Sequence, residues 1–289
     1  MAKKSNLFET LKNKGKTLDA EMSFFDHLEI LRWHIIRSVI AIGVFAIVAF
    51  SFYQPLFENV IVAPKNPDFW TYRMMCKIGE WLNMDGFCVE QIPINLINTE
   101  VAGQFMMQIN SSLLMAVALG FPYLIFEIWL FVKPALSELE RDSARGFIFY
   151  ASILFIIGVL FGYFIVIPLS LNFLSNVSLS MEVVNQITIS SYFSTIAILT
   201  LGCGVIFLLP IAIYILSKLG IMTPQFMRAS RRYAIVIILI IAAIITPTAD
   251  VITMLTVSAP MFILYEISIS VSARVQKQKE GKNTELKKS

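Results

Sequence analysis

The sequence has 289 residues, of which 57% are hydrophobic and 15% charged, and its formal net charge is only +3. Soluble globular chains carry nearer a quarter of charged residues, so this composition excludes a typical soluble domain and predicts an integral membrane protein. The sequence contains no HExxH, GxxxxGK or GxSxG motif, so it predicts no metal site, phosphate-binding loop or nucleophile elbow of these kinds.

The first predicted element is a short amphipathic helix over residues 23–32 that leads into the membrane. Phe24 and Leu28 lie on one face at helical spacing, whereas Glu29 and Arg32 lie mostly on the other face. A helix of this kind rests its apolar face among the lipid headgroups.

Six apolar segments follow, and each predicts a transmembrane helix. They are residues 33–53, 104–131, 147–169, 193–216, 233–245 and 251–271. About 20 apolar residues are needed to cross a bilayer, a length that the first four segments reach. The fifth would reach only about 20 Å as a helix, and the short sequence TPTAD at 246–250 separates it from the sixth. We therefore predict short fifth and sixth spans that thin the bilayer locally or hide their polar tip against other spans.

The distribution of Lys and Arg predicts the orientation of these spans. Only three of the 23 basic residues, Lys65, Arg73 and Lys77, fall on the side opposite the two termini. Because positive residues concentrate in cytoplasmic segments, both termini and the charged loop at 131–147 are predicted to be cytoplasmic. The predicted organisation is a basic cytoplasmic tail over 1–22, a six-helix membrane domain over 23–272 and a second basic tail over 273–289.

Seven motifs occur along the chain in a characteristic order. They are HLEILR at 27–32, APK at 63–65, FPYLIFEIWLFVKPALSELER at 121–141, GYFIVIPL at 162–169, TP at 223–224, RRYA at 231–234 and TPTAD at 246–250. With six predicted spans and both ends inside, their order and spacing resemble the TatC family, the multispanning receptors of the twin-arginine protein translocase. The resemblance covers residues 22–271. It implies a concave, all-α bundle without enzymatic activity or a cofactor, located in the bacterial cytoplasmic (inner) membrane.

The resemblance also implies partners. The protein would bind twin-arginine signal peptides on folded cargo and move that cargo with single-span partners of the TatA and TatB type, using the proton-motive force. Self-association and contact with membrane lipids are expected, and a nucleic-acid partner is not. Two other classes of function remain open: a membrane scaffold that has lost signal-peptide recognition, and a small-solute transporter.

The implied signal-peptide surface combines the N-terminal HLEILR segment with the loop after the second span. Its candidate residues are His27, Leu28, Glu29, Arg32, Phe131, Pro134, Leu136 and Glu140. A carboxylate accepts a guanidinium through a charge-assisted pair, and two adjacent arginines need more than one acceptor. Glu138 and Glu140 point about 200° apart on a helix, so Glu140 is predicted to act with an acid of the N-terminal helix.

Other candidate residues match family positions outside that surface. Pro64 and Pro122 match bend residues, Tyr163 an aromatic residue of the third span, and Asp250 the acid of the outer turn. Glu127 stands out on physical grounds, because an acid inside a membrane segment is a functional candidate. A structural Glu that faces the bundle is an equally good interpretation.

The chain departs from the family pattern at three positions. Ile30 replaces the usual Glu of the HLxELR segment, Leu208 replaces a membrane-buried acid of the fourth span, and Met254 replaces a Gln after the outer turn. These apolar residues are the sequence feature that favours the scaffold interpretation.

Two cysteines, Cys76 and Cys88, lie twelve residues apart in a loop that the charge distribution places outside the cytoplasm. An oxidising compartment would favour a disulfide bond between them. Two free thiols are the alternative.

Overall fold

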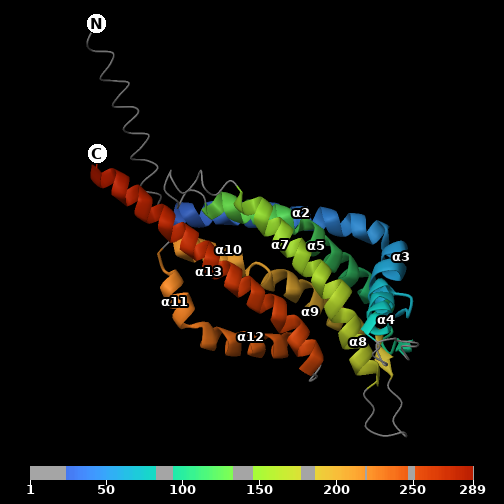
Figure 1. The fold of residues 1–289 in the computed structure, drawn as a ribbon. Helices are drawn as coiled ribbons and strands as arrows, with labels where there is room; N and C mark the ends of the chain where they lie inside the picture. The colour runs from blue at the N-terminus through green and yellow to red at the C-terminus, as the bar shows by residue number, and fades with distance from the viewer. Residues whose placement is uncertain are drawn as a thin grey trace.

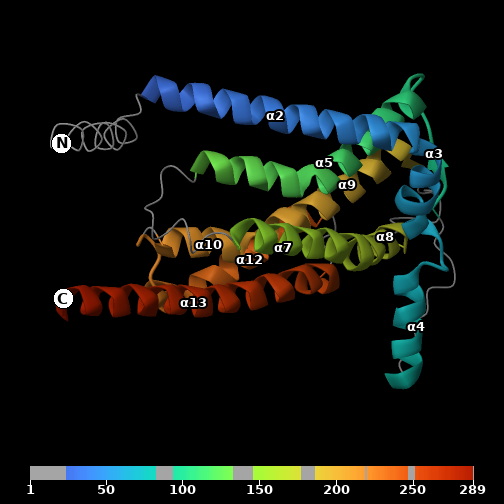
Figure 2. The same cartoon turned by 90° about the horizontal axis from the view of Figure 1, so that it is seen from above.

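The structure, a computed structural model, describes residues 24–82, 94–132, 146–176, 186–218, 220–246 and 251–288. These residues form a predominantly helical bundle whose long helices run side by side (Figure 1). Helix α2 (Phe24–Ser51) begins and helix α13 (Val251–Lys288) ends at one end of the bundle, here called the proximal end (Figures 1 and 2). The opposite, distal end carries α3 (Tyr53–Leu56) and α4 (Trp70–Leu82).

Helix α2 packs mainly against α5 (Gly103–Val132). The predicted interfacial helix over 23–32 is not a separate element, because α2 continues from Phe24 into the first span without interruption. No Gly or Pro occurs between residues 24 and 42 to end the helix earlier. Most of the outward face of α2 is exposed, as expected for a helix that meets lipid rather than water.

The third and fourth spans are each built from consecutive helical pieces. The third consists of α7 (Phe147–Phe161), the π-helical η4 (Gly162–Val166) and α8 (Ile167–Asn176). The fourth consists of α9 (Ile189–Ile206) and α10 (Leu209–Lys218), which a short turn joins.

Small residues allow α7 and α9 to approach closely. A Cβ atom added at Gly158 would lie 2.6 Å from the carbonyl oxygen of Cys203 and 2.9 Å from Cα of Gly204. Gly162, four residues later, lies against Leu199 and Cys203 in the same way. This GxxxG spacing is the arrangement by which membrane helices bring their backbones into van der Waals contact.

The last helices are α11 (Pro224–Ala229), α12 (Arg231–Ile245) and α13. Helix α12 has 15 residues, so the fifth predicted span is short, at about 22 Å. Helix α13 continues as far as Lys288, through the segment predicted as a C-terminal tail.

Within the described residues, five helical stretches are long and apolar enough to cross a membrane. They are Leu28–Ser51, Gly103–Phe131, Ile148–Asn176, Ile189–Ser217 and Thr253–Lys277. The protein is therefore a multi-pass membrane protein, and α12, the fifth predicted span, is too short to be one of the five. The sixth span was predicted to be short as well, but its apolar stretch in α13, Thr253–Lys277, has 25 residues.

At the distal end, the chain leaves α3 through the π-helical η1 (Phe57–Ile61) and the 3-10 turn η2 (Ala63–Lys65). Two short strands, β1 (Leu96–Ile97) and β2 (Ile187–Thr188), pair in parallel there and join the segments before α5 and α9. Helix α4 was not predicted from the sequence, which indicated only a polar loop in this region.

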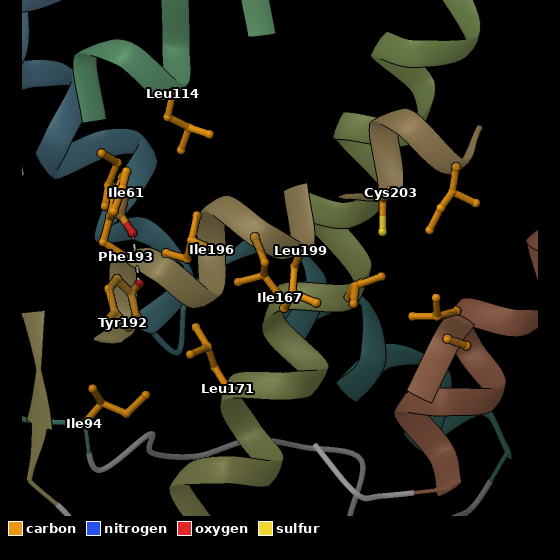
Figure 3. Close-up of a cluster of buried hydrophobic side chains, with 14 of the residues drawn as sticks. Ile61, Ile94, Leu114, Ile167, Leu171, Tyr192, Phe193, Ile196, Leu199 and Cys203 are labelled. Atoms are coloured by element: carbon orange, nitrogen blue, oxygen red, sulfur yellow. Dashed lines mark hydrogen bonds between the residues drawn. The ribbon is translucent and has the colours of Figure 1, made fainter. Parts of the chain in front are cut away.

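The main core surrounds α9. Tyr192, Phe193, Ile196, Leu199 and Cys203 of that helix project toward side chains of the other elements (Figure 3). Those partners include Ile61, Leu114, Ile167 and Leu171. Such dense contact holds helices together by dispersion where lipid gives no hydrophobic driving force.

Candidate functional site

The most prominent polar group inside the bundle is the carboxylate of Glu127 on α5, which is only 2% exposed. Its Oε2 lies 2.5 Å from Nδ1 of His34 on α2. Its Oε1 accepts a hydrogen bond of 2.6 Å from the hydroxyl of Tyr123. Both carboxylate oxygens therefore have partners, which a buried acid requires because leaving it unpaired is costly.

The local sequence explains how these groups meet. Tyr123 and Glu127 are four residues apart on α5, so their side chains lie on one helical face. Phe131, four residues further on, continues the same face, and its ring lies 6.4 Å from that of His34 in an edge-to-face arrangement. Ser38 also donates a hydrogen bond to the carbonyl oxygen of His34. The proximal halves of α2 and α5 are thus joined through His34.

Beyond this junction, toward the proximal end, the first turns of α2 carry predicted binding residues. Leu28, Glu29 and Arg32 are exposed there. Ile30, which replaces the family's usual Glu, is half-buried and so points differently from Glu29. The structure therefore brings Phe131 to α2 and leaves Leu28, Glu29 and Arg32 accessible at the same end of the molecule.

Several predicted residues lie outside what the structure describes. His27 belongs to α2, but the position of its side chain is not described. Pro134, Leu136 and Glu140 lie in the segment 133–145, and Asp250 precedes α13, so all four fall outside the described residues. Cys76 is on α4, whereas Cys88 is likewise outside them.

A cluster of three tyrosines organises the distal end. Tyr163 donates a hydrogen bond of 2.6 Å to the carbonyl oxygen of Val60, and Tyr192 one of 2.9 Å to that of Ile61 (Figure 3). Tyr72 lies 3.1 Å from the carbonyl oxygens of both Pro64 and Pro168. A helix end leaves carbonyl groups without intrahelical partners, and these phenols satisfy them where η1 and η2 end.

The cluster brings two predicted residues, Pro64 and Tyr163, into one region of the fold. Pro64 is fully buried, and its carbonyl accepts from Tyr72. Burial raises the pKa of the Tyr72 phenol far above its ordinary value, so this group stays protonated and continues to donate. These contacts support structural roles for Pro64 and Tyr163.

An apolar cavity of about 380 Å³ lies between η1, α5, α7, η4 and α9. Pro122 and Tyr163 both line it, so two more predicted residues lie close to one another. Thr200 also lines it, and its buried hydroxyl oxygen has no hydrogen-bond partner among the described residues.

The other two departures from the family pattern are occupied by packing residues. Leu208 lies between α9 and α10, against the cluster that includes Phe121 and Phe155. Met254 packs against the main core. Within the described part of the chain, no group of three or more His, Cys, Asp or Glu residues is arranged to hold a metal ion.

Two features of the site were missed by sequence reasoning. One is the contact of His34 with Glu127, and the other is the 2.8 Å ion pair between Glu266 on α13 and Arg231 on α12. The four-residue spacing of Tyr123 and Glu127 was a visible signal that this face of α5 is polar. No comparable signal identifies His34 as the partner, because it lies 93 residues away in the sequence.

Comparison with known proteins gives consistent results. The family described as "Sec-independent protein translocase protein (TatC)" matches residues 26–260. The chain is 36% identical over 261 residues to the TatC protein of Blattabacterium sp. subsp. Periplaneta americana, which covers 90% of this chain and 98% of that one. It is 30% identical to TatCy of Bacillus subtilis over a match that covers 87% of this chain and 89% of that one. A crystal structure of the twin arginine translocase receptor TatC superposes with a TM-score of 0.64 at 30% identity, covering 86% of this chain and 99% of that chain.

Proposed function

Because the chain belongs to the TatC family of Sec-independent protein translocase components, we propose that it is the signal-peptide receptor of a twin-arginine translocase. The observation that carries the proposal is the junction of α2 and α5. There the His34–Glu127 contact and the packing of Phe131 hold the proximal end of α2 beside the end of α5, where the charged loop begins.

The peptide's two arginines would each need an acceptor. Glu29 is exposed on α2 and makes no ion pair within the described residues, so it is available for one guanidinium. Glu140, in the loop after α5, would accept the other through a charge-assisted hydrogen bond. Leu28 and Phe131 would contact the apolar residues that accompany the arginine pair.

The wider role follows from the family and from the charge distribution. We expect both termini and the proximal end to face the cytoplasm, since 20 of the 23 Lys and Arg residues fall on that side of the predicted spans. Cargo that binds there would then be moved across the bacterial inner membrane with TatA- and TatB-type partners, driven by the proton-motive force.

Crosslinking of a twin-arginine peptide to the purified protein in membranes tests the proposal, with a twin-lysine peptide as the control. Charge-assisted hydrogen bonds are worth about 1.5–3 kcal/mol each, so Glu140→Gln should weaken binding roughly ten- to a hundredfold. Glu140→Arg should weaken it further by repulsion, and Glu29→Gln should also weaken it. Glu58→Gln, at the distal end in η1, is the matched control and should leave binding unchanged.

Ile30→Glu should tighten binding, because it adds an acid near the same surface. The receptor assignment at this loop would be wrong if Glu140→Arg bound the peptide as well as the wild type does. If the wild type itself bound no twin-arginine peptide, the scaffold interpretation would be favoured instead.

A further inference from the structure

Helix α4 differs from the long membrane-spanning helices in its direction (Figure 2). It leaves the distal end of the bundle and runs across the axes of the membrane-spanning helices (Figure 2). A helix in that position, perpendicular to spans that cross a bilayer, runs parallel to the membrane surface.

The start of α4 is firmly attached to the bundle. Thr71 donates a hydrogen bond to the carbonyl oxygen of Phe164, and Tyr72 contacts the carbonyl oxygens of Pro64 and Pro168. The ring of Phe69, just before the helix, stacks on that of Phe164 with centroids 5.7 Å apart. The direction of α4 is therefore fixed by its first turn, which contacts η4 and the first turn of α8.

The remainder of α4 carries an exposed apolar face. Trp70, Met74, Ile78 and Trp81 recur at intervals of four, four and three residues, which places them on one side of a helix. Trp81 is 82% exposed, and the other three are about half exposed. These four residues are called the α4 apolar face.

Charged residues lie along a different arc of the same helix. Arg73, Lys77 and Glu80 are all exposed and fall between about 280° and 340° when Trp70 is set at 0° and each residue adds about 100°. The α4 apolar face occupies about 0–80° on the same scale. The two arcs adjoin, because Lys77 lies only about 20° from Trp70 on this scale. Tryptophan with basic residues beside it is typical of helices that lie in a membrane interface.

We propose that α4 is an interfacial helix whose apolar face enters the headgroup layer of the bilayer at the distal membrane surface. The partner is the lipid surface rather than another protein, because three observations agree. The helix runs in the membrane plane, tryptophan occupies both ends of its apolar face, and Arg73 and Lys77 lie beside that face where they reach lipid phosphates.

This proposal depends on the protein crossing a membrane and not on signal-peptide recognition. Its consequence is that α4 fixes the depth of the distal end in the bilayer. The tyrosine cluster to which α4 is attached would then sit at the level of the headgroups.

Fluorescence quenching of the full-length protein in single-copy nanodiscs of phosphatidylethanolamine and phosphatidylglycerol tests the proposal. The signal of Trp81 is the difference between the wild type and Trp81→Phe, a substitution that should fold because the side chain is largely exposed. Phospholipids brominated near the headgroup should quench this signal more strongly than those brominated near the chain ends. Aqueous iodide should quench it several-fold less than it quenches free N-acetyltryptophanamide.

A matched pair of variants separates the apolar face from the charged arc. Ile78→Gln and Glu80→Gln each introduce a neutral amide on α4, but only the first lies on the apolar face. Ile78→Gln should reduce quenching by the shallow brominated lipid, and Glu80→Gln should not.

The proposal is overturned if iodide reaches Trp81 as readily as free indole and brominated lipids do not quench it. It is also overturned if Trp81 is shielded in vesicles that hold many copies but not in single-copy nanodiscs. That second result would assign the α4 apolar face to contact between copies of the chain.

Discussion

His34 on α2 and Glu127 on α5 lie 2.5 Å apart across the first two spans, although 93 residues separate them in the sequence. The hydroxyl of Tyr123 donates a hydrogen bond to the other oxygen of the same carboxylate. This buried polar contact fixes how the proximal ends of α2 and α5 sit against each other, and hence where the proposed peptide-binding residues lie.

Loss of one partner of this contact should destabilise the protein strongly. His34→Phe leaves the buried acid without its main partner, which costs about 3–5 kcal/mol in comparable buried pairs. The double variant His34→Phe/Glu127→Leu should recover much of that loss, because no buried charge remains. The measurement is the free energy of unfolding in mixed micelles titrated with sodium dodecyl sulfate.

The exposed ion pair between Arg231 and Glu266 is the control for that experiment. Glu266→Gln should cost less than His34→Phe, because the Glu266 side chain is 36% exposed whereas Glu127 is almost fully buried. Equal effects of His34→Phe and Glu266→Gln would show that the His34–Glu127 contact is not structurally important.

Replacement of Gly158 should loosen the contact between α7 and α9. An alanine Cβ there would lie 2.6 Å from the carbonyl oxygen of Cys203, so the helices must separate, at a cost of about 1–3 kcal/mol. Gly43→Ala is the matched control on α2, because no atom lies within 4 Å of the added carbon. That variant should be neutral or stabilise the helix by up to about 1 kcal/mol. Unfolding in the same micelles distinguishes the two, and a destabilised Gly43→Ala beside an unaffected Gly158→Ala would refute the packing argument.

Cys76 and Cys88 are predicted to form a disulfide bond. Alkylation of the native protein should then modify neither residue until a reductant is added, and reduction should lower stability by about 3 kcal/mol for a loop of this size. The number of alkylated cysteines is read from the mass of the protein. Cys203 should not be alkylated in the folded protein, because it is only 2% exposed. Cys76→Ser should leave Cys88 open to alkylation without reductant. Full labelling of the wild type before reduction would rule out the bond.

The length of α12 should matter for transport. At 15 residues it reaches about 22 Å, less than the hydrocarbon core of about 30 Å, so the bilayer beside it is expected to thin. Insertion of four leucines should restore the length and impair export of a twin-arginine reporter. The control keeps the length and replaces four exposed residues by leucine: Ile235, Val236, Ile237 and Ile240. Unchanged export by the lengthened protein would show that the mismatch has no functional role.

The long apolar helices were predictable because each depends mainly on local composition. The apolar segments at 104–131 and 233–245 differ from α5 and α12 by no more than two residues at either end. The continuity of residues 24–32 with the first span was missed, because an amphipathic segment and a fully apolar one have different patterns even where they form a single helix. Helix α4 was missed for a different reason. Its apolar residues recur at helical spacing, but the charged residues between them lower the mean hydropathy of the segment, so it resembled a polar loop.

The candidate site was less predictable than the fold. Glu127 could be singled out, because an acid in an apolar segment is conspicuous in any sequence. Its partner could not, because a contact between His34 and Glu127 depends on how two helices cross, and no local pattern records that. The same holds for Tyr192 and Ile61.

The hydrogen bond from Tyr192 to Ile61 joins residues 131 positions apart. A ribosome adding about 5–20 residues per second releases Tyr192 roughly 7–26 s after Ile61. In that interval α2 and α5 can already pair, while the carbonyl oxygen of Ile61 in η1 has no hydrogen bond from Tyr192. Closure of the distal end by Tyr192 therefore waits until α9 is made, and a chain whose synthesis stops before α9 leaves the carbonyl oxygen of Ile61 without this phenol.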